Sequence, residues 1–268
     1  MLERQRPWAV VSAILCTYSA ILAMAAETPT PLETAKPAGP PTAAATAVKD
    51  GGSGIVRVTK DYDIWIDPKQ KLVIVDGQIC LREGVLEMFA CPKGTKEHEA
   101  IVSVNCKAKF VHAALMAVGA QPGKPVSFDP VYRPASGPIV DVYVLWQDEA
   151  GKKQRVRAQE WVKELKTDKP MTDSWVFAGS DFWTDTTTGE KYYQADGGDF
   201  ICVSNFPTAL LDLPIASTQT NDSLLFTAAT ERIPPLGTKV RLVLIPRADK
   251  NKEAGKAAKQ MPPKPPAQ

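Results

Sequence analysis

The fold is decided around residues 91–119, CPKGTKEHEAIVSVNCKAKFVHAALMAVG, which carry the most distinctive side chains of this 268-residue chain. Two of the five cysteines and both histidines of the chain fall within this stretch. It starts with a polar loop at 92–97, continues as the apolar run 99–104, and ends in a segment with helical periodicity. The stretch therefore predicts a strand followed by a helix, with the candidate site chemistry near their junction.

The predicted helix covers residues 106–118. Asn105 is a favoured N-cap residue, and Gly119 is a natural C-terminal stop. At 100° per residue the apolar side chains occupy one arc of this helix, which we expect to be the face that packs on a sheet. The members of this arc are Phe110, Val111, Ala114, Leu115, Ala117 and Val118.

Short strand patterns lie on both sides of this stretch. Residues 72–76 and 85–91 are predicted strands before it, and 138–146 and 240–246 are predicted strands after it. A short amphipathic helix is predicted at 158–165. The order of strands, helix and further strands predicts a single α+β domain, in which one main helix packs on a mostly antiparallel sheet.

The N-terminal residues 1–26 have the pattern of a secretory signal peptide. Arg4 and Arg6 precede an apolar run, and Ala23-Met24-Ala25 fits a cleavage signal of small residues. The pattern predicts an exported protein of the periplasm or cell envelope. Membrane anchoring is expected only if the leader stays uncleaved, because its apolar run of about 18 residues is at the lower limit of a spanning length.

Composition also separates the folded domain from its flanks. Residues 27–54 are rich in Pro, Ala, Thr and Gly, and residues 247–268 are rich in Lys and Pro. Such segments bury too little apolar surface to offset the entropy of ordering, so they predict a disordered linker and a disordered tail. The domain is therefore expected at 55–246. The net charge of +2 and the absence of a basic stripe argue against a nucleic-acid partner.

Cys91 and His98 form the most specific candidate pair. If the loop 92–97 closes a hairpin, their Cβ atoms face each other at ~5 Å. A thiolate and an imidazole at that distance can share a soft metal ion, or the imidazole can activate the thiol. The alternative is a buried cysteine beside a partly exposed histidine. Glu99 follows on the opposite face of the expected strand.

Cys106 and His112 are the candidates on the predicted helix. In the first helical turn, unpaired N–H groups and the helix dipole would stabilise a Cys106 thiolate; the alternative is a half-buried small residue. His112 lies at the edge of the apolar arc, which favours a core-edge residue with its hydrogen bonds satisfied. The two residues are about 120° apart around the helix and ~9 Å apart along it, so they do not readily bind one ion.

Four cysteines remain beyond the leader, and they allow three disulfide pairings. A hairpin that turns at Glu83-Gly84 would place Cys80 and Cys91 ~13 Å apart, too far for a disulfide. A Cys91–Cys106 bridge, or a bridge from Cys202 to any of the others, stays open.

Several short motifs follow one another in a characteristic order. They are Glu83-Gly84-Val85-Leu86-Glu87, Cys91, Lys96-Glu97-His98-Glu99, His112-Ala113-Ala114-Leu115, Gly119-Ala120 and Trp175-Val176-Phe177-Ala178-Gly179-Ser180. This series resembles the YdjY-domain family of exported bacterial proteins, over about residues 59–246. The resemblance implies no established activity and no cofactor. Its recurring pattern includes His98, Glu99 and His112.

These observations favour an exported binding or accessory module of the cell envelope without catalysis of its own. The chain contains neither the HExxH motif of zinc proteases nor the G-x-S-x-G motif of hydrolases. One alternative is a metal- or thiol-dependent enzyme centred on Cys91 and His98, with Glu99 and His112 nearby. A second alternative is a purely structural domain that contains a disulfide. The cofactor, ligand and protein partners stay unassigned.

Overall fold

The computed structural model describes residues 48–49, 54–217 and 224–248. The chain divides into Met1–Ala43 and Ala44–Gln268, and all described residues belong to the second unit. The predicted signal peptide lies outside the described residues, as do most of the predicted linker and tail. Val48–Lys49, at the end of the predicted linker, pair as strand β1 with β2, so ordered structure begins before residue 55.

The described residues form mostly strands. In chain order the elements are β1 (Val48–Lys49), β2 (Val56–Arg57), β3 (Ile64–Asp67), β4 (Leu72–Ile79), β5 (Met88–Pro92), β6 (Ala100–Val104), α1 (Ala108–Ala117), β7 (Ile139–Gln147), β8 (Lys153–Arg157), η1 (Ala158–Trp161), β9 (Val162–Glu164), β10 (Trp175–Phe177), β11 (Phe182–Thr184), β12 (Lys191–Tyr193), η2 (Gln194–Gly197), β13 (Ile201–Cys202), β14 (Leu211–Asp212), β15 (Phe226–Ala228) and β16 (Lys239–Pro246).

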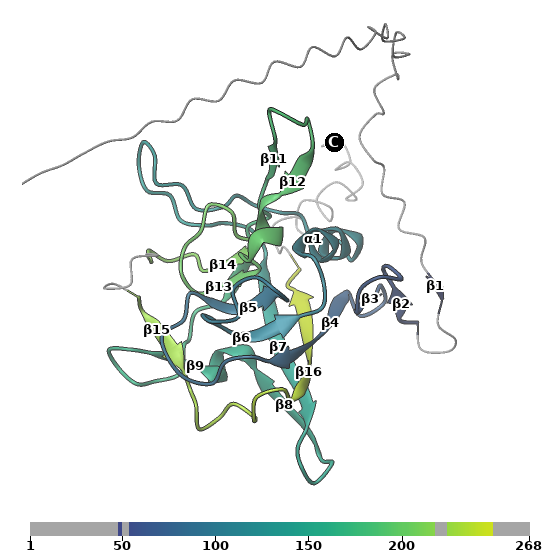
Figure 1. The fold of residues 1–268 in the computed structure, drawn as a ribbon, viewed down its shortest axis with the longest axis vertical. Helices are drawn as coiled ribbons and strands as arrows, with labels where there is room; N and C mark the ends of the chain where they lie inside the picture. The colour runs from purple at the N-terminus through teal and green to yellow at the C-terminus, as the bar shows by residue number, and fades with distance from the viewer. Residues whose placement is uncertain (1–47, 50–53, 218–223, 249–268) are drawn as a thin grey trace, which may run out of the picture. The chain divides into compact units, whose positions relative to one another are not determined.

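Eight of these strands close into a barrel (Figure 1). They follow the order β4-β16-β7-β10-β14-β13-β5-β6, and β6 pairs in turn with β4. The β5–β6 and β13–β14 pairs are parallel, and the other pairs of the barrel are antiparallel. Strands β2 and β3 extend the sheet from β4, and β8 pairs with β7.

The predicted α+β class is therefore wrong. Strands account for 38% of the structure and helices for 10%, and the strands form a closed barrel rather than a sheet that carries a helix. The error comes from pairings that are distant in sequence, such as Lys239 with Gln78, which local periodicity does not reveal. The helix expected at 158–165 is also wrong, because only one 3₁₀ turn, η1, forms there before the chain continues as β9.

The main helix is confirmed, with a shifted start. It runs over Ala108–Ala117 and contacts β3, β4 and η2. Its N-cap is Lys107, without a capping side chain, so the expected role of Asn105 as N-cap is wrong. The helix ends at the predicted glycine, since Gly119 has φ +98°. The N–H of Gly119 donates to the carbonyl of Met116, and the N–H of Ala120 donates to the carbonyl of Leu115. This left-handed turn satisfies the last carbonyls of the helix, which is the reason that a glycine stands there. None of the helices among the described residues is long and apolar enough to cross a membrane.

Side-chain alternation explains which strand faces form the core. In β7, Val140, Val142 and Val144 are buried, and their neighbours are partly exposed. β16 alternates in the same way. Every residue of β5 and β6, in contrast, is buried. Their second face is covered by a small apolar cluster outside the main core, made of Met88, Cys91, Ala100, Cys202, Phe206 and Ala209. Burial on both faces is typical of parallel strand pairs.

Gly77 marks the point where the barrel closes. Residues 72–75 of β4 pair with β3, whereas residues 77–79 pair with β6 along the same edge. A Cβ atom at Gly77 would lie 2.6 Å from the carbonyl oxygen of Ser103 on β6. Only glycine therefore lets β6 approach β4 closely enough to complete the barrel.

Candidate functional site

The loop between β5 and β6, residues 93–99, organises the candidate site. Because β5 and β6 are parallel, with Met88 opposite Ala100 and Cys91 opposite Ser103, this loop carries the chain back along the full length of β5. Parallel strands are usually joined by a dozen or more residues, so this return is unusually short. The expected hairpin over this loop is wrong.

The parallel arrangement separates Cys91 from His98. Met88 is the partner of Ala100, so His98 is about five strand positions, or ~16 Å, from the level of Cys91. Cys91 is fully buried, and the His98 side chain is 77% exposed. The only partner that the described residues provide for His98 in an ion pair is Glu99, with 3.8 Å between Nε2 and Oε2.

Lys96, at the centre of the loop, gathers three carboxylates. Its Nζ lies 3.1 Å from Asp199 Oδ1, 3.6 Å from Glu99 Oε1 and 3.9 Å from Glu87 Oε2. The second carboxylate oxygen of Asp199 accepts a hydrogen bond from the Thr208 hydroxyl. The ammonium also lies 4.3 Å from the ring centroid of Phe206, so residues just before β5 and on either side of β13 hold the loop in place.

The charges in this Lys96 cluster influence one another. Burial raises the pKa of Glu87, and the nearby Glu99 carboxylate raises it further. Burial opposes the charge on Lys96, but the carboxylates, Asp199 first, more than offset it, so the pKa of Lys96 is raised. The arrangement is one half-buried cation that balances several carboxylates. These ion pairs of Lys96 hold the 93–99 loop in place.

Cys91 has a thiol neighbour that the sequence did not predict. Cys80 lies just beyond β4, and the influence of each thiol on the other raises the pKa of Cys80 and lowers that of Cys91. The Cys80 thiol also lies 3.0 Å from the carbonyl oxygen of Ala100. The hairpin between β4 and β5 from which the separation of Cys80 and Cys91 was predicted does not form. Both pair with β6 instead.

Cys106 and His112 lie apart from this group. Cys106 precedes the helix, and burial raises the pKa of its thiol to about 12, so the dipole does not activate it. His112 Nδ1 is 2.8 Å from the hydroxyl of Tyr193, which itself donates to the carbonyl of Gly179. Burial lowers the pKa of His112. His112 is thus a core-edge residue with a hydrogen-bond partner, which is the simpler of the two sequence interpretations.

The described residues contain no group of three or more His, Cys, Asp and Glu side chains arranged to hold a metal ion. The four cysteines among them are free thiols. The five sequence candidates, Cys91, His98, Glu99, Cys106 and His112, therefore do not converge on one centre. Glu99 belongs to the Lys96 cluster, and Cys91 has Cys80 as a neighbour.

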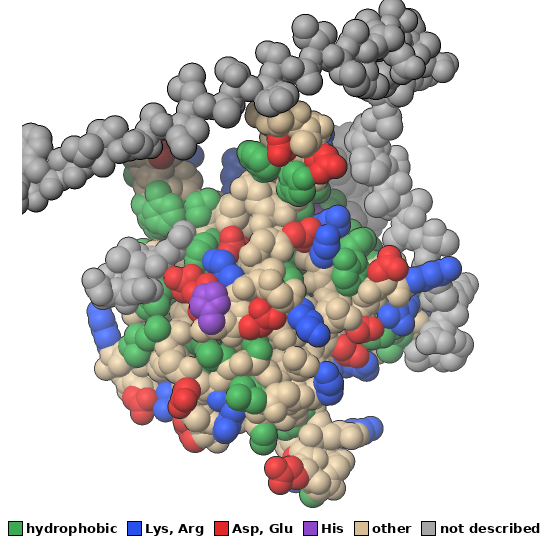
Figure 2. All heavy atoms as spheres, viewed as in Figure 1, with side chains coloured by type: hydrophobic (Ala, Val, Ile, Leu, Met, Phe, Trp, Pro, Cys, Tyr) green, Lys and Arg blue, Asp and Glu red, His purple; other side chains and the backbone are tan. Residues whose placement is uncertain are grey.

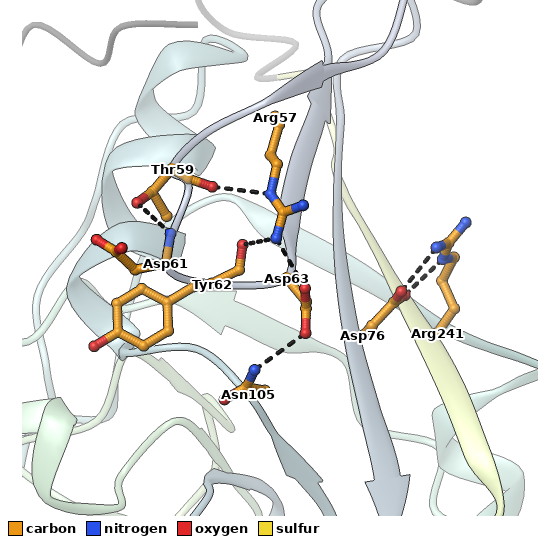
Figure 3. Close-up of polar contacts among 8 residues, drawn as sticks. All are labelled: Arg57, Thr59, Asp61, Tyr62, Asp63, Asp76, Asn105 and Arg241. Carbon is orange, nitrogen blue, oxygen red and sulfur yellow. Dashed lines mark hydrogen bonds and ion pairs between the residues drawn. The ribbon is translucent and has the colours of Figure 1, made fainter. Parts of the chain in front are cut away.

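Sequence reasoning missed a groove on the outer surface of the barrel. It has a volume of about 830 Å³ and is lined from β4, β6, β7, β8 and β16 and their connections. Among its lining residues, Arg241 binds Asp76 through two hydrogen bonds of 2.6 and 2.8 Å, and Asn105 donates to Asp63 (Figure 3). Asp63 is also bound by Arg57, at 3.0 Å. The alternating polar residues of β4 and β16 were the only local signal for this surface.

Comparison with known proteins gives one match, to a family model. The model of the YdjY domain family matches residues 64–245, which is more than half of the chain. The chain belongs to the YdjY domain family, as its motifs predicted. No curated protein and no solved structure matches it.

Replacing Lys96 tests the balance of charges in its cluster. We expect Lys96→Met to lower the free energy of unfolding by about 1–3 kcal/mol at pH 7, because it leaves the carboxylates without their cation. The raised pKa of Glu87 means that the folded protein holds a proton on the Glu87 carboxyl group more tightly than the unfolded chain does. The folded state is therefore penalised as pH rises above the ordinary value of 4.5. Without Lys96 this penalty grows, so the loss should be smaller at pH 4 than at pH 7.

Urea unfolding at both pH values measures this difference. Lys60→Met removes an exposed lysine and serves as the matched control. An equal loss for Lys96→Met at pH 4 and pH 7 would show that the side chain contributes packing rather than charge.

Proposed function

We propose that this domain is a non-catalytic module of the cell envelope that binds an extended acidic polysaccharide in the groove between β4, β16, β7 and β8. The observation that carries the proposal is an excess of basic side chains in this groove. Four basic and two acidic residues line it, and both acidic residues are already paired with arginines.

Three lysines of the groove are available to a ligand. Lys93, Lys153 and Lys239 make no ion pair with any described residue, and Lys239 Nζ donates only to Gln78, at 2.9 Å. On the face in Figure 2, acidic and basic side chains are interspersed, without a large patch of one sign. A local surplus of ammonium groups favours a ligand with spaced carboxylates or sulfates.

The remaining lining favours a sugar polymer over a compact anion. The amide side chains of Gln78, Asn105, Gln147 and Gln154 line the groove and can donate to and accept from hydroxyl groups. Trp146 offers part of its ring surface, and the groove is open to solvent. An open groove with spaced polar groups suits a chain that lies along it.

Export is part of the same proposal, and it rests on the leader pattern of residues 1–26. If the leader is cleaved after Ala25 or Ala26, the intact mass of the protein recovered from the envelope fraction will lack these residues. Recovery of the full-length mass from the cytoplasmic fraction would contradict export.

Calorimetric titration with a galacturonic acid oligomer tests the binding. We expect the full chain to bind the acidic oligomer more tightly than an uncharged galactose oligomer, with an affinity that falls as salt rises. Lys153→Gln combined with Lys239→Gln should weaken binding about tenfold or more, because two charge contacts are lost.

The control is Lys60→Gln combined with Lys166→Gln, which removes the same charge from exposed sites outside the groove. Equal affinities for both double variants would place any binding elsewhere, for instance on the basic C-terminal tail. Binding of neither oligomer would overturn the proposal.

A further inference from the structure

The hairpin of β11 and β12 carries two exposed aromatic rings that the groove does not use. The two strands form a sheet of their own and project from the barrel (Figure 1). Trp183 and Tyr192 are direct partners across the hairpin, so their side chains lie on the same face. Their ring centroids are 5.9 Å apart and their ring planes are inclined by 32°. Since 53% of Trp183 and 47% of Tyr192 is exposed, the pair offers an open aromatic surface.

Two carboxylates lie on the same face of the hairpin. Side chains alternate between the faces along a strand, so Asp185 and Glu190, each two residues from a ring, share the face of Trp183 and Tyr192. Glu190 accepts a hydrogen bond from the Tyr192 hydroxyl, and Asp185 accepts from two backbone N–H groups of the turn. Neither carboxylate makes an ion pair with any described residue. Aromatic rings beside unneutralised carboxylates favour a cationic partner.

The opposite face fixes the hairpin on the domain. Tyr193 is buried there, and its hydroxyl donates to the carbonyl of Gly179 at 2.9 Å and lies 2.8 Å from His112 Nδ1. The ring centroid of Phe182 lies 5.1 Å from that of Tyr193. The exposed rings are therefore presented in a fixed position, which lowers the entropic cost of binding.

The described chain ends close to the base of this hairpin. Ala248, the last described residue, lines a pocket together with Pro122. Pro122 also packs on Gly179, where an added Cβ atom would lie 2.4 Å from the Cβ atom of Pro122. Gly179 stands three residues before Phe182, the first residue of β11. Lys264 follows Ala248 by 264 − 248 = 16 residues, which reach up to ~50 Å when extended, so it can reach the aromatic face.

We propose that the aromatic face of the β11–β12 hairpin binds the chain's own C-terminal segment 260–268, QMPPKPPAQ. Residues 249–268 lie outside the described part of the chain, and their sequence contains five lysines and only two acidic residues. Their surplus of positive charge complements the free carboxylates of the hairpin.

The segment 260–268 also matches the two rings. Lys264 stands between two pairs of prolines. Proline-rich segments dock on aromatic surfaces with a small loss of backbone entropy, because proline already fixes φ. The Lys264 ammonium then pairs with Glu190 or Asp185 beside the rings. Because the segment is tethered beside the hairpin, its local concentration is high and a weak contact is sufficient.

Carbodiimide crosslinking of the full chain tests this contact, since the reagent joins an amine and a carboxylate that touch, with the loss of one water. Trypsin does not cleave before proline, so digestion places the hairpin carboxylates in the peptide 167–191 and Lys264 in the peptide 260–268. We expect these two peptides to be linked, and fragmentation to place the link between Lys264 and Glu190 or Asp185.

Two sets of variants keep every crosslinking group and remove one partner of the contact. Trp183→Ala combined with Tyr192→Ala should lower the yield of the linked peptides about fivefold or more, because two aromatic contacts are lost. Alanine at all four prolines of the segment should have the same effect, and it leaves the described domain unchanged. Phe128→Ala removes a ring that is 49% exposed elsewhere, and this matched control should keep the yield.

A mixture of ¹⁵N-labelled and unlabelled protein shows whether the contact lies within one chain. We expect each linked pair of peptides to carry a single isotope. Absence of the link, an equal yield after loss of Trp183 and Tyr192, or linked pairs that mostly combine both isotopes would overturn the proposal.

Discussion

The parallel pairing of β5 and β6 is the constraint on which the rest of the structure depends. A loop of only seven residues, 93–99, returns the chain so that β6 lies beside β5 in the same direction. β6 then has a free edge for β4, and the β4–β6 pair closes the barrel. Two parallel neighbours with both faces buried also require an apolar cover outside the barrel, which Phe206 and Ala209 help to supply.

The same loop explains why the reactive side chains lie where they do. Because the chain turns back so tightly, Lys96 points among the carboxylates of Glu87, Glu99 and Asp199, and His98 faces solvent. The loop also begins two residues beyond Cys91, whose pKa is lowered by the neighbouring Cys80 thiol. The Lys96 cluster and the thiol pair are therefore two consequences of one connection, whereas the groove arises from the outer side chains of β4 and β16.

Local features of the sequence predicted the local structure well. The helix and its end at Gly119 follow from periodicity and from the left-handed turn that glycine allows. Strand patterns located β7 and β16 because valine and leucine alternate with polar residues there. The apolar runs at 85–91 and 99–104 do not alternate, and this was the available sign of a parallel pair buried on both faces.

Local sequence patterns could not predict which distant strands pair with one another. Nothing near Cys91 indicates that Cys80 is its neighbour, since the contact depends on β6 being inserted between β4 and β5. Asp199 is far from Lys96 in sequence, and its approach to Lys96 depends on the β13–β5 pairing. Of the five candidate residues, Cys91 and Glu99 took part in clusters whose other members the sequence did not reveal.

The closure at Gly77 tests the account most directly. In Gly77→Ala the new methyl group would lie 2.6 Å from the Ser103 carbonyl, and β6 would have to move away from β4. Urea unfolding should show a loss of about 1–3 kcal/mol for this variant. Gly197→Ala, with no neighbouring atom within 4 Å of the added methyl group, should change the stability by less than about 0.5 kcal/mol. Equal stability of the Gly77→Ala variant and the unaltered protein would contradict a barrel closed by β4 and β6.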